Sequence, residues 1–273
     1  MQPDVTTAPA GTTGAVLTDG VARGDRFVAF LGAPGEPSGP GWVAATDLFG
    51  PGLPAALDVV ASARGTGSRA VAGSLLLEQY AHRVVAPVLA AWFEEGRVVD
   101  ARLGSVRIEQ VGAGFARVVF SGPVSTTGTR RAVGDGLVAG NLEPAAQAVH
   151  EHTRAGMRVL RGVVANAVAT SLLHLSWPCD DGARYVPVLR AFLAENPVLD
   201  GLVGIEAIEE AGRTWMYTDR RTCCLAFRTE VARSREVPYC ATCPVVPDAD
   251  SRALFRGAAR DYLKRHPHLR PRA

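Results

Sequence analysis

The chain has 273 residues, of which 47% are hydrophobic and 21% charged, and its formal net charge is +2. This composition is typical of a folded globular protein with a buried core. The small net charge argues against nonspecific nucleic-acid binding. No apolar stretch approaches the length of about 18 residues that a membrane span needs. Because Met1–Val5 has neither a basic start nor an apolar run, we expect no signal peptide and a cytoplasmic protein.

The N-terminal half is expected to carry one long helix. Residues 1–24 are rich in Thr, Ala, Gly and Pro without periodicity, which predicts a mobile arm. A long amphipathic helix should begin near Ser68, because apolar residues over Leu77–Trp92 recur at i, i+3 and i+4. Pro87 lies inside this stripe and should kink or split the helix, since proline has no backbone N–H.

The rest of the chain mixes strand and helix signals. Alternation predicts a β-hairpin over 106–120, and one or two short strands are expected over 205–218. Three further helices are expected, over residues 141–177, 184–196 and 251–265. His174 lies among leucines and should be a packed core histidine. The prediction is an α+β fold with long packed helices, a small antiparallel sheet and a C-terminal cysteine segment.

We expect residues 25–210 to form a helical and hairpin core. Residues 211–273 should form the cysteine segment and the terminal helix, packed on that core as one unit. Trp215 and Tyr217 precede the cysteines and alternate along the expected strand. They could wall a substrate pocket or simply belong to the core.

Cysteines supply the clearest chemical signal. Four of the five lie in the spacing C-C-x15-C-x2-C, at Cys223, Cys224, Cys240 and Cys243. In a reducing compartment such a cluster is more typical of metal binding or catalysis than of disulfides. The fifth, Cys179, stands alone and is expected to be structural or incidental.

Three interpretations of this spacing are open. A structural zinc site fits Cys240-x-x-Cys243, but an adjacent pair places two sulfurs on one small ion only with strain. A thioredoxin-like dithiol would open a helix, and Pro244 makes that setting unfavourable. A [2Fe–2S] cluster relaxes the problem, because Cys223 and Cys224 can each turn to a different iron.

The local sequence resembles one family. Asp219–Arg228 reads DRRTCCLAFR and Cys240–Pro244 reads CATCP, which together resemble the C-terminal signature of FhuF-like ferric-siderophore reductases. A looser resemblance extends over about residues 45–245. In that family the four cysteines hold a [2Fe–2S] cluster that passes one electron to Fe(III) in a hydroxamate siderophore. The gap Leu225–Tyr239, fifteen residues here, is longer than is usual in that family.

The resemblance implies that Cys223, Cys224, Cys240 and Cys243 are cluster ligands. It further implies a cytosolic ferric-siderophore reductase that releases Fe(II). The alternative is a zinc-stabilised or non-catalytic siderophore-handling protein. No flavin or nicotinamide motif is legible, so electrons are expected from a partner such as a reduced ferredoxin or a flavin reductase.

Arginines surround the cysteine motif. Arg220, Arg221 and Arg228 are expected to tune the cluster or orient a partner, because positive charge stabilises thiolates. The other interpretation is that they are ordinary solvated arginines. A second basic stripe recurs every four residues along the last helix, at Arg252, Arg256, Arg260 and Lys264. It is either a docking surface or the polar face of an amphipathic helix.

Overall fold

The computed structural model describes residues 37, 39–125, 128–240 and 242–269, so the arm predicted over residues 1–24 lies outside the described residues. The helices are α3 (Ala45–Leu48), α4 (Leu53–Arg64), α5 (Arg69–Glu95), α6 (Arg130–Gly134), the π-helical segment η2 (Asp135–Leu142), α7 (Glu143–Thr153), α8 (Met157–Ser176), α9 (Tyr185–Glu195), α10 (Glu230–Arg233) and α11 (Asp248–Arg265). The strands are β1 (Trp42–Ala44), β2 (Val98–Val99), β3 (Val106–Val111), β4 (Gly114–Phe120), β5 (Val124–Ser125), β6 (Val203–Glu210) and β7 (Arg213–Arg220).

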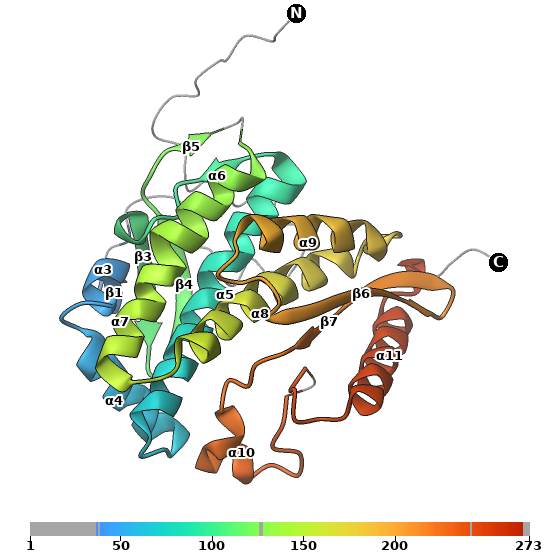
Figure 1. Ribbon diagram of the computed structural model, residues 1–273. Helices are drawn as coiled ribbons and strands as arrows, with labels where there is room; N and C mark the ends of the chain where they lie inside the picture. Colours follow the sequence, from blue (N-terminus) through green and yellow to red (C-terminus); the bar gives the residue numbers. More distant parts are fainter. Residues whose placement is uncertain (1–36, 38, 126–127, 241, 270–273) are drawn as a thin grey trace, which may run out of the picture.

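Long helices and small antiparallel sheets confirm the predicted α+β class. Strands β1, β3 and β4 form one sheet in that order, while β2 pairs with β5 and β6 with β7, all antiparallel. Helices α5 and α8 pack against each other through the middle of the molecule (Figure 1). The β3–β4 hairpin lies on one side of this pair and the β6–β7 hairpin on the other.

Helix α5 begins where the sequence predicted, and it does not break at its proline. The hydroxyl of Ser68 accepts a hydrogen bond from the Val71 N–H at 3.4 Å, and Gly96 ends the helix in the left-handed conformation. Pro87 lies inside the continuous helix and is buried, so of the two predicted effects, a kink or a split, the split is wrong. Packing on several faces of α5 offsets the hydrogen bond that a proline removes.

The helix expected over residues 141–177 is two helices. The chain is already helical before Asn141, in the π-helical segment, and α7 then ends at Arg154, which has a φ of 59°. A left-handed residue turns the chain, and α8 starts after Gly156. The apolar periodicity continues across the break because both helices pack on the same core, so periodicity alone did not reveal the turn.

Helix α8 is long and apolar enough to cross a membrane by length and composition alone. However, 78% of its most apolar window is buried inside the fold. A central helix of a globular protein has this property, because a helix that is apolar all round is covered by its neighbours.

The predicted strands before the cysteines form the β6–β7 hairpin, and α11 packs against it. Trp215 of β7 meets Trp177 edge to face at 5.6 Å and Tyr262 of α11 at 6.3 Å. The basic stripe of α11 pairs mainly with acids of β6: Arg252 with Glu206, and Arg256 with Glu210. Most of the stripe therefore attaches the helix to the hairpin.

Candidate functional site

The end of strand β7 leads directly into the cysteine pair, and two helices hold that pair in place. The hydroxyl of Ser74 on α5 donates a hydrogen bond to the Cys224 carbonyl at 2.9 Å. On α8, a Cβ added to Gly162 would lie 1.6 Å from Oγ1 of Thr222. The glycine thus allows the residue before Cys223 to pack directly on the helix backbone.

The second cysteine arm folds back onto the first. The Arg220 N–H donates to the Thr242 carbonyl at 3.3 Å, which joins the end of β7 to the Cys-x-x-Cys turn. Within that turn the Cys243 N–H donates to the Cys240 carbonyl at 2.9 Å. Residues separated by more than a dozen positions in the chain therefore form one small structure.

The four thiols are neighbours, and all are free rather than disulfide-bonded. The Cys223 and Cys243 thiols interact with each other, while Cys240 interacts electrostatically with both Cys224 and Cys243. Among the residues that the structure describes, no group of three or more His, Cys, Asp or Glu side chains is arranged so that it could hold a metal ion. The sulfurs are assembled in one region without the spacing of a coordination shell.

Three of the four sulfurs accept a hydrogen bond from the backbone two residues further on. The Leu225 N–H donates to the Cys223 sulfur at 3.3 Å. The Ala226 and Val245 backbones do the same for Cys224 and Cys243, respectively. Such N–H donors orient metal-binding sulfurs and tune their charge, so this donor set fits a thiolate-bound metal group.

Burial keeps two of these thiols protonated when no metal is bound. It raises the pKa of Cys224 to about 11 and that of Cys243 to about 11, and the backbone donors only partly offset the effect. Reactive dithiols have lowered thiol pKa values. Neither of these two buried thiols therefore has the lowered pKa of a reactive cysteine.

Arg220 is the charged group at the centre of the site. Its side chain is buried (4% exposed) and forms an ion pair with Glu78 of α5. Burial lowers its pKa, but the attraction of Glu78 and then of Cys224 and Cys240 outweighs burial, so the net pKa is raised. Its Nε is buried with no hydrogen-bond partner among the described atoms.

The other predicted arginines lie further out. Arg221 is exposed, and Arg228 is exposed over the ring of Phe227, 5.7 Å from its centroid. Trp215 and Tyr217 are buried between β7 and α11. The structure thus places these two aromatics in the core, which is one of the two roles that their sequence position allowed.

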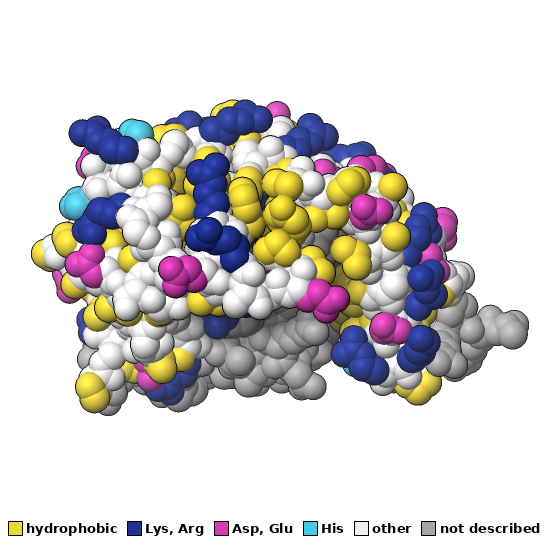
Figure 2. All heavy atoms as spheres, turned by 90° about the horizontal axis from the view of Figure 1, so that it is seen from below, with side chains coloured by type: hydrophobic (Ala, Val, Ile, Leu, Met, Phe, Trp, Pro, Cys, Tyr) yellow, Lys and Arg dark blue, Asp and Glu magenta, His cyan; other side chains and the backbone are white. Residues whose placement is uncertain are grey.

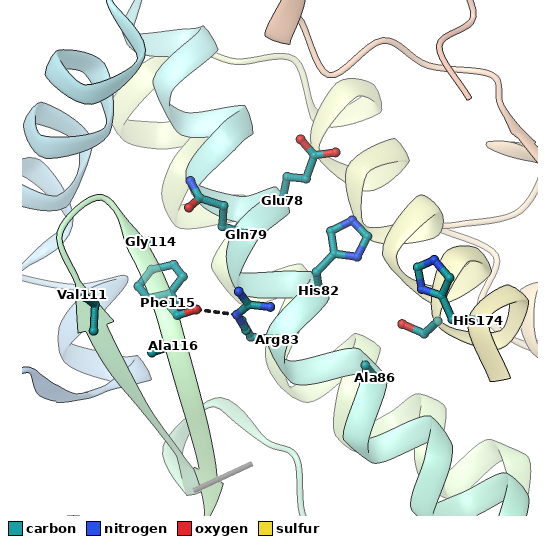
Figure 3. A pocket seen from close by; sticks show the side chains of 11 residues that line it. Glu78, Gln79, His82, Arg83, Ala86, Val111, Gly114, Phe115, Ala116 and His174 are labelled. Carbon is teal, nitrogen blue, oxygen red and sulfur yellow. Dashed lines mark hydrogen bonds between the residues drawn. The ribbon is translucent and has the colours of Figure 1, made fainter. Parts of the chain in front are cut away.

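A cavity of about 580 Å³ is lined by Glu78, the ion-pair partner of Arg220. We call it the α5–α8 pocket; Figure 3 shows side chains from both helices and from the β3–β4 hairpin around it. Its lining includes Glu78, Gln79, His82, Arg83, Phe115 and His174. A smaller cavity of about 340 Å³ is lined by Arg220, Cys243 and Val245.

Sequence reasoning missed this pocket. His174 was expected in the core, but it is exposed at the pocket, so that prediction is wrong. Glu78 and His82 are one turn apart on α5, and this spacing was the available signal. Burial, together with the charges of Arg220 and Arg83, lowers the pKa of His82 despite Glu78.

No protein-family model matches the chain, and no curated protein matches it.

Proposed function

We propose that the protein is a one-electron reductase whose Cys223, Cys224, Cys240 and Cys243 hold a [2Fe–2S] cluster. The observation that carries the proposal is the convergence of both cysteine arms, with backbone N–H donors directed at three of the sulfurs. When bound, a [2Fe–2S] group supplies one-electron transfer. The adjacent pair favours two irons over a single tetrahedral zinc ion.

The residues around the cysteines have separate tasks in this proposal. Backbone donors at Leu225, Ala226 and Val245 stabilise sulfur charge. Arg220 holds a buried positive charge beside the thiols, and Glu78 holds that charge in position. A fixed cation in a low-dielectric site stabilises added negative charge more strongly than one in water does.

The substrate we propose is Fe(III) held by a hydroxamate siderophore. The net reaction adds one electron from a donor protein to Fe(III) and gives Fe(II). Hydroxamate oxygens, which are hard anionic donors, hold Fe(II) far less tightly, so the metal leaves and the chelator takes up protons. The donor is expected to be a reduced ferredoxin or a flavin reductase, and the compartment is expected to be the cytoplasm.

The surface near the cysteine segment suits a protein partner. Val237, Tyr239 and Val245 are exposed large apolar residues in or beside the loop that joins the two cysteine arms. Figure 2 shows the molecule from below, with apolar side chains gathered in the middle of the face and both basic and acidic side chains around them. Exposed apolar residues of this kind favour docking of a protein partner such as an electron carrier.

An anaerobic spectrum of protein produced with iron tests the proposal. The expected result is visible absorption that bleaches with dithionite, a reduced-state EPR signal, and about two irons and two sulfides per chain. Cys223→Ser should abolish the signal, whereas Cys179→Ser, which changes the cysteine outside the site, should retain it. A colourless protein containing zinc would instead support the zinc-stabilised, non-catalytic alternative.

Turnover is measured separately, as Fe(II) trapped by a coloured chelator after the dithionite-reduced protein meets a ferric trihydroxamate. Wild type and Cys179→Ser should release Fe(II) at equal rates, and Cys223→Ser should not exceed the rate without protein. Equal rates for all three would contradict the proposed activity even if a cluster is present.

A further inference from the structure

We propose that the α5–α8 pocket binds the ferric hydroxamate chelate. The inference rests on the proposed function for the identity of the ligand, and it adds the place of binding and the side chains that recognise it. The first support is location. Glu78 lines the pocket and also pairs with Arg220, which interacts with Cys224 and Cys240. A single ion pair therefore separates the pocket from the thiols.

Size distinguishes this pocket from its neighbour. Its volume of about 580 Å³ falls well inside the range of about 300–1,000 Å³ that small-molecule sites occupy. The cavity beside Cys243 measures about 340 Å³, near the lower limit of that range. A chelate that wraps three hydroxamates around one metal ion needs the larger space.

The lining matches the outer surface of such a chelate. In a trihydroxamate the metal is enclosed, and the exterior presents carbonyl and amide oxygens joined by methylene spacers. The pocket offers side-chain N–H groups at Gln79 and Arg83, together with the apolar side chains of Ala86 and Phe115. Side-chain donors of the pocket can bind the oxygens of the chelate, and its apolar side chains can pack against the methylene spacers. Small-molecule sites fix the orientation of their ligands by this combination.

The side chains around the pocket are held by the fold. Arg83 donates to the Phe115 carbonyl, which joins α5 to the hairpin (Figure 3). Gln79 donates to the Leu75 carbonyl at 3.3 Å. A pocket built across α5, α8 and β4 is pre-formed, so less conformational entropy is lost on binding. An enclosed metal needs no protein ligands, and recognition of this kind requires only the outer groups of the chelate.

The test uses a gallium(III) trihydroxamate, because Ga(III) has a charge and coordination like those of Fe(III) but is not reduced under these conditions. Calorimetric titration of the full chain then measures binding independently of electron transfer. Ala116→Trp, a half-buried position on the pocket wall, should weaken binding by about tenfold or more. Its control is Ala207→Trp, at an exposed strand position away from the pocket, which should leave binding unchanged.

A second variant keeps the test decisive if the tryptophan disturbs folding. His174→Ala truncates an exposed side chain at the pocket, and it should weaken binding by about threefold to tenfold. His152→Ala makes the same change on the exposed face of α7 and should have no effect. Circular dichroism of each variant verifies that the fold is retained.

The outcomes separate the two proposals. Binding lost in Ala116→Trp and His174→Ala but kept in both controls supports the pocket, even if the protein reduces no iron and the reductase proposal fails. Binding that is absent in wild type, or unchanged in both pocket variants, overturns the inference while leaving the cluster and turnover assays to decide the function. Binding blocked by Val245→Trp and not by Ala116→Trp would also overturn it, in favour of the smaller cavity.

Discussion

Gly162 of α8 and Thr222, the residue before the cysteine pair, are in such close contact that no side chain fits on the glycine. A Cβ at position 162 would lie 1.6 Å from Oγ1 and 2.6 Å from Cβ of Thr222. Thr222 is buried, so it has little room to move away. This contact sets how closely the start of the cysteine segment, just after strand β7, packs against helix α8.

Gly162→Ala should therefore push the segment away from α8. We expect a loss of about 1–3 kcal/mol in the free energy of unfolding, typical of overpacking, and a lower metal content. Denaturant unfolding and metal analysis measure the two effects. The matched control is Gly257→Ala on α11, where an added Cβ meets nothing within 4 Å. That change should be neutral or stabilising by about 0.5–1 kcal/mol, and equal losses in both variants would contradict the role of the contact.

The Glu78–Arg220 pair should affect both stability and redox potential. Glu78→Gln leaves a buried guanidinium without its counter-charge and should cost about 3 kcal/mol. It should also raise the reduction potential of the metal-loaded protein, because the local charge becomes more positive. Arg220→Gln should lower the potential, since it removes the cation beside the sulfurs.

Potentiometric titration followed by visible absorption measures these opposite shifts. Arg221→Gln, the exposed neighbour, is the control for a change of charge and should shift the potential less. Shifts of the same sign in Glu78→Gln and Arg220→Gln would show that the pair acts only through folding.

Acid should weaken the attachment of α11 to the β6–β7 hairpin. The guanidiniums of Arg256 and Arg260 hold the pKa of Glu210 below its usual value of 4.5, against a smaller effect of burial. A carboxyl with a lowered folded-state pKa contributes stability above its unfolded pKa, and loses that contribution as the pH falls through the folded value. The difference in stability between wild type and Glu210→Gln should be constant at neutral pH and shrink below about 4.5.

Tryptophan fluorescence monitors this interface, because Trp177 and Trp215 both contact Tyr262 of α11. Glu236→Gln, an exposed glutamate outside the interface, is the control. A difference between wild type and Glu210→Gln that persists unchanged at acidic pH would exclude the proposed electrostatic attachment.

Metal loading should order the segment between the cysteine arms. Because the described thiols are not spaced as a coordination shell, binding must draw the arms together, and metal binding of this kind couples to local folding. Hydrogen exchange of Leu225–Tyr239 should slow on loading, while exchange in α9 should not change. Equal exchange of Leu225–Tyr239 with and without metal would show that the arms are already fixed.

Short-range signals predicted much of this fold from the sequence. Ser68 and the apolar stripe after it located the start of α5, and alternation located the β3–β4 hairpin, because capping and periodicity act within a few residues. Where the β6–β7 hairpin lies, only one or two short strands were expected. The cysteine spacing identified the candidate site, because each of the two cysteine groups lies within a few residues of the chain. Arg220 was placed beside the cysteines by sequence proximity, and the structure finds it there.

Features that depend on neighbours far along the chain were not predictable in this way. Pro87 stays within a helix because the surrounding core stabilises it, and the turn at Arg154 lies inside an unbroken apolar pattern.

What the sequence by itself determined is the chemistry: four thiols in two short arms, with arginine beside them. Only the tertiary structure decided which residues from other parts of the chain contact the cysteine segment. Glu78 meets Arg220 from 142 positions away, and Gly162 meets Thr222 across the core. Such pairings follow from how whole helices pack, and packing is set by the summed burial of many side chains rather than by any local pattern.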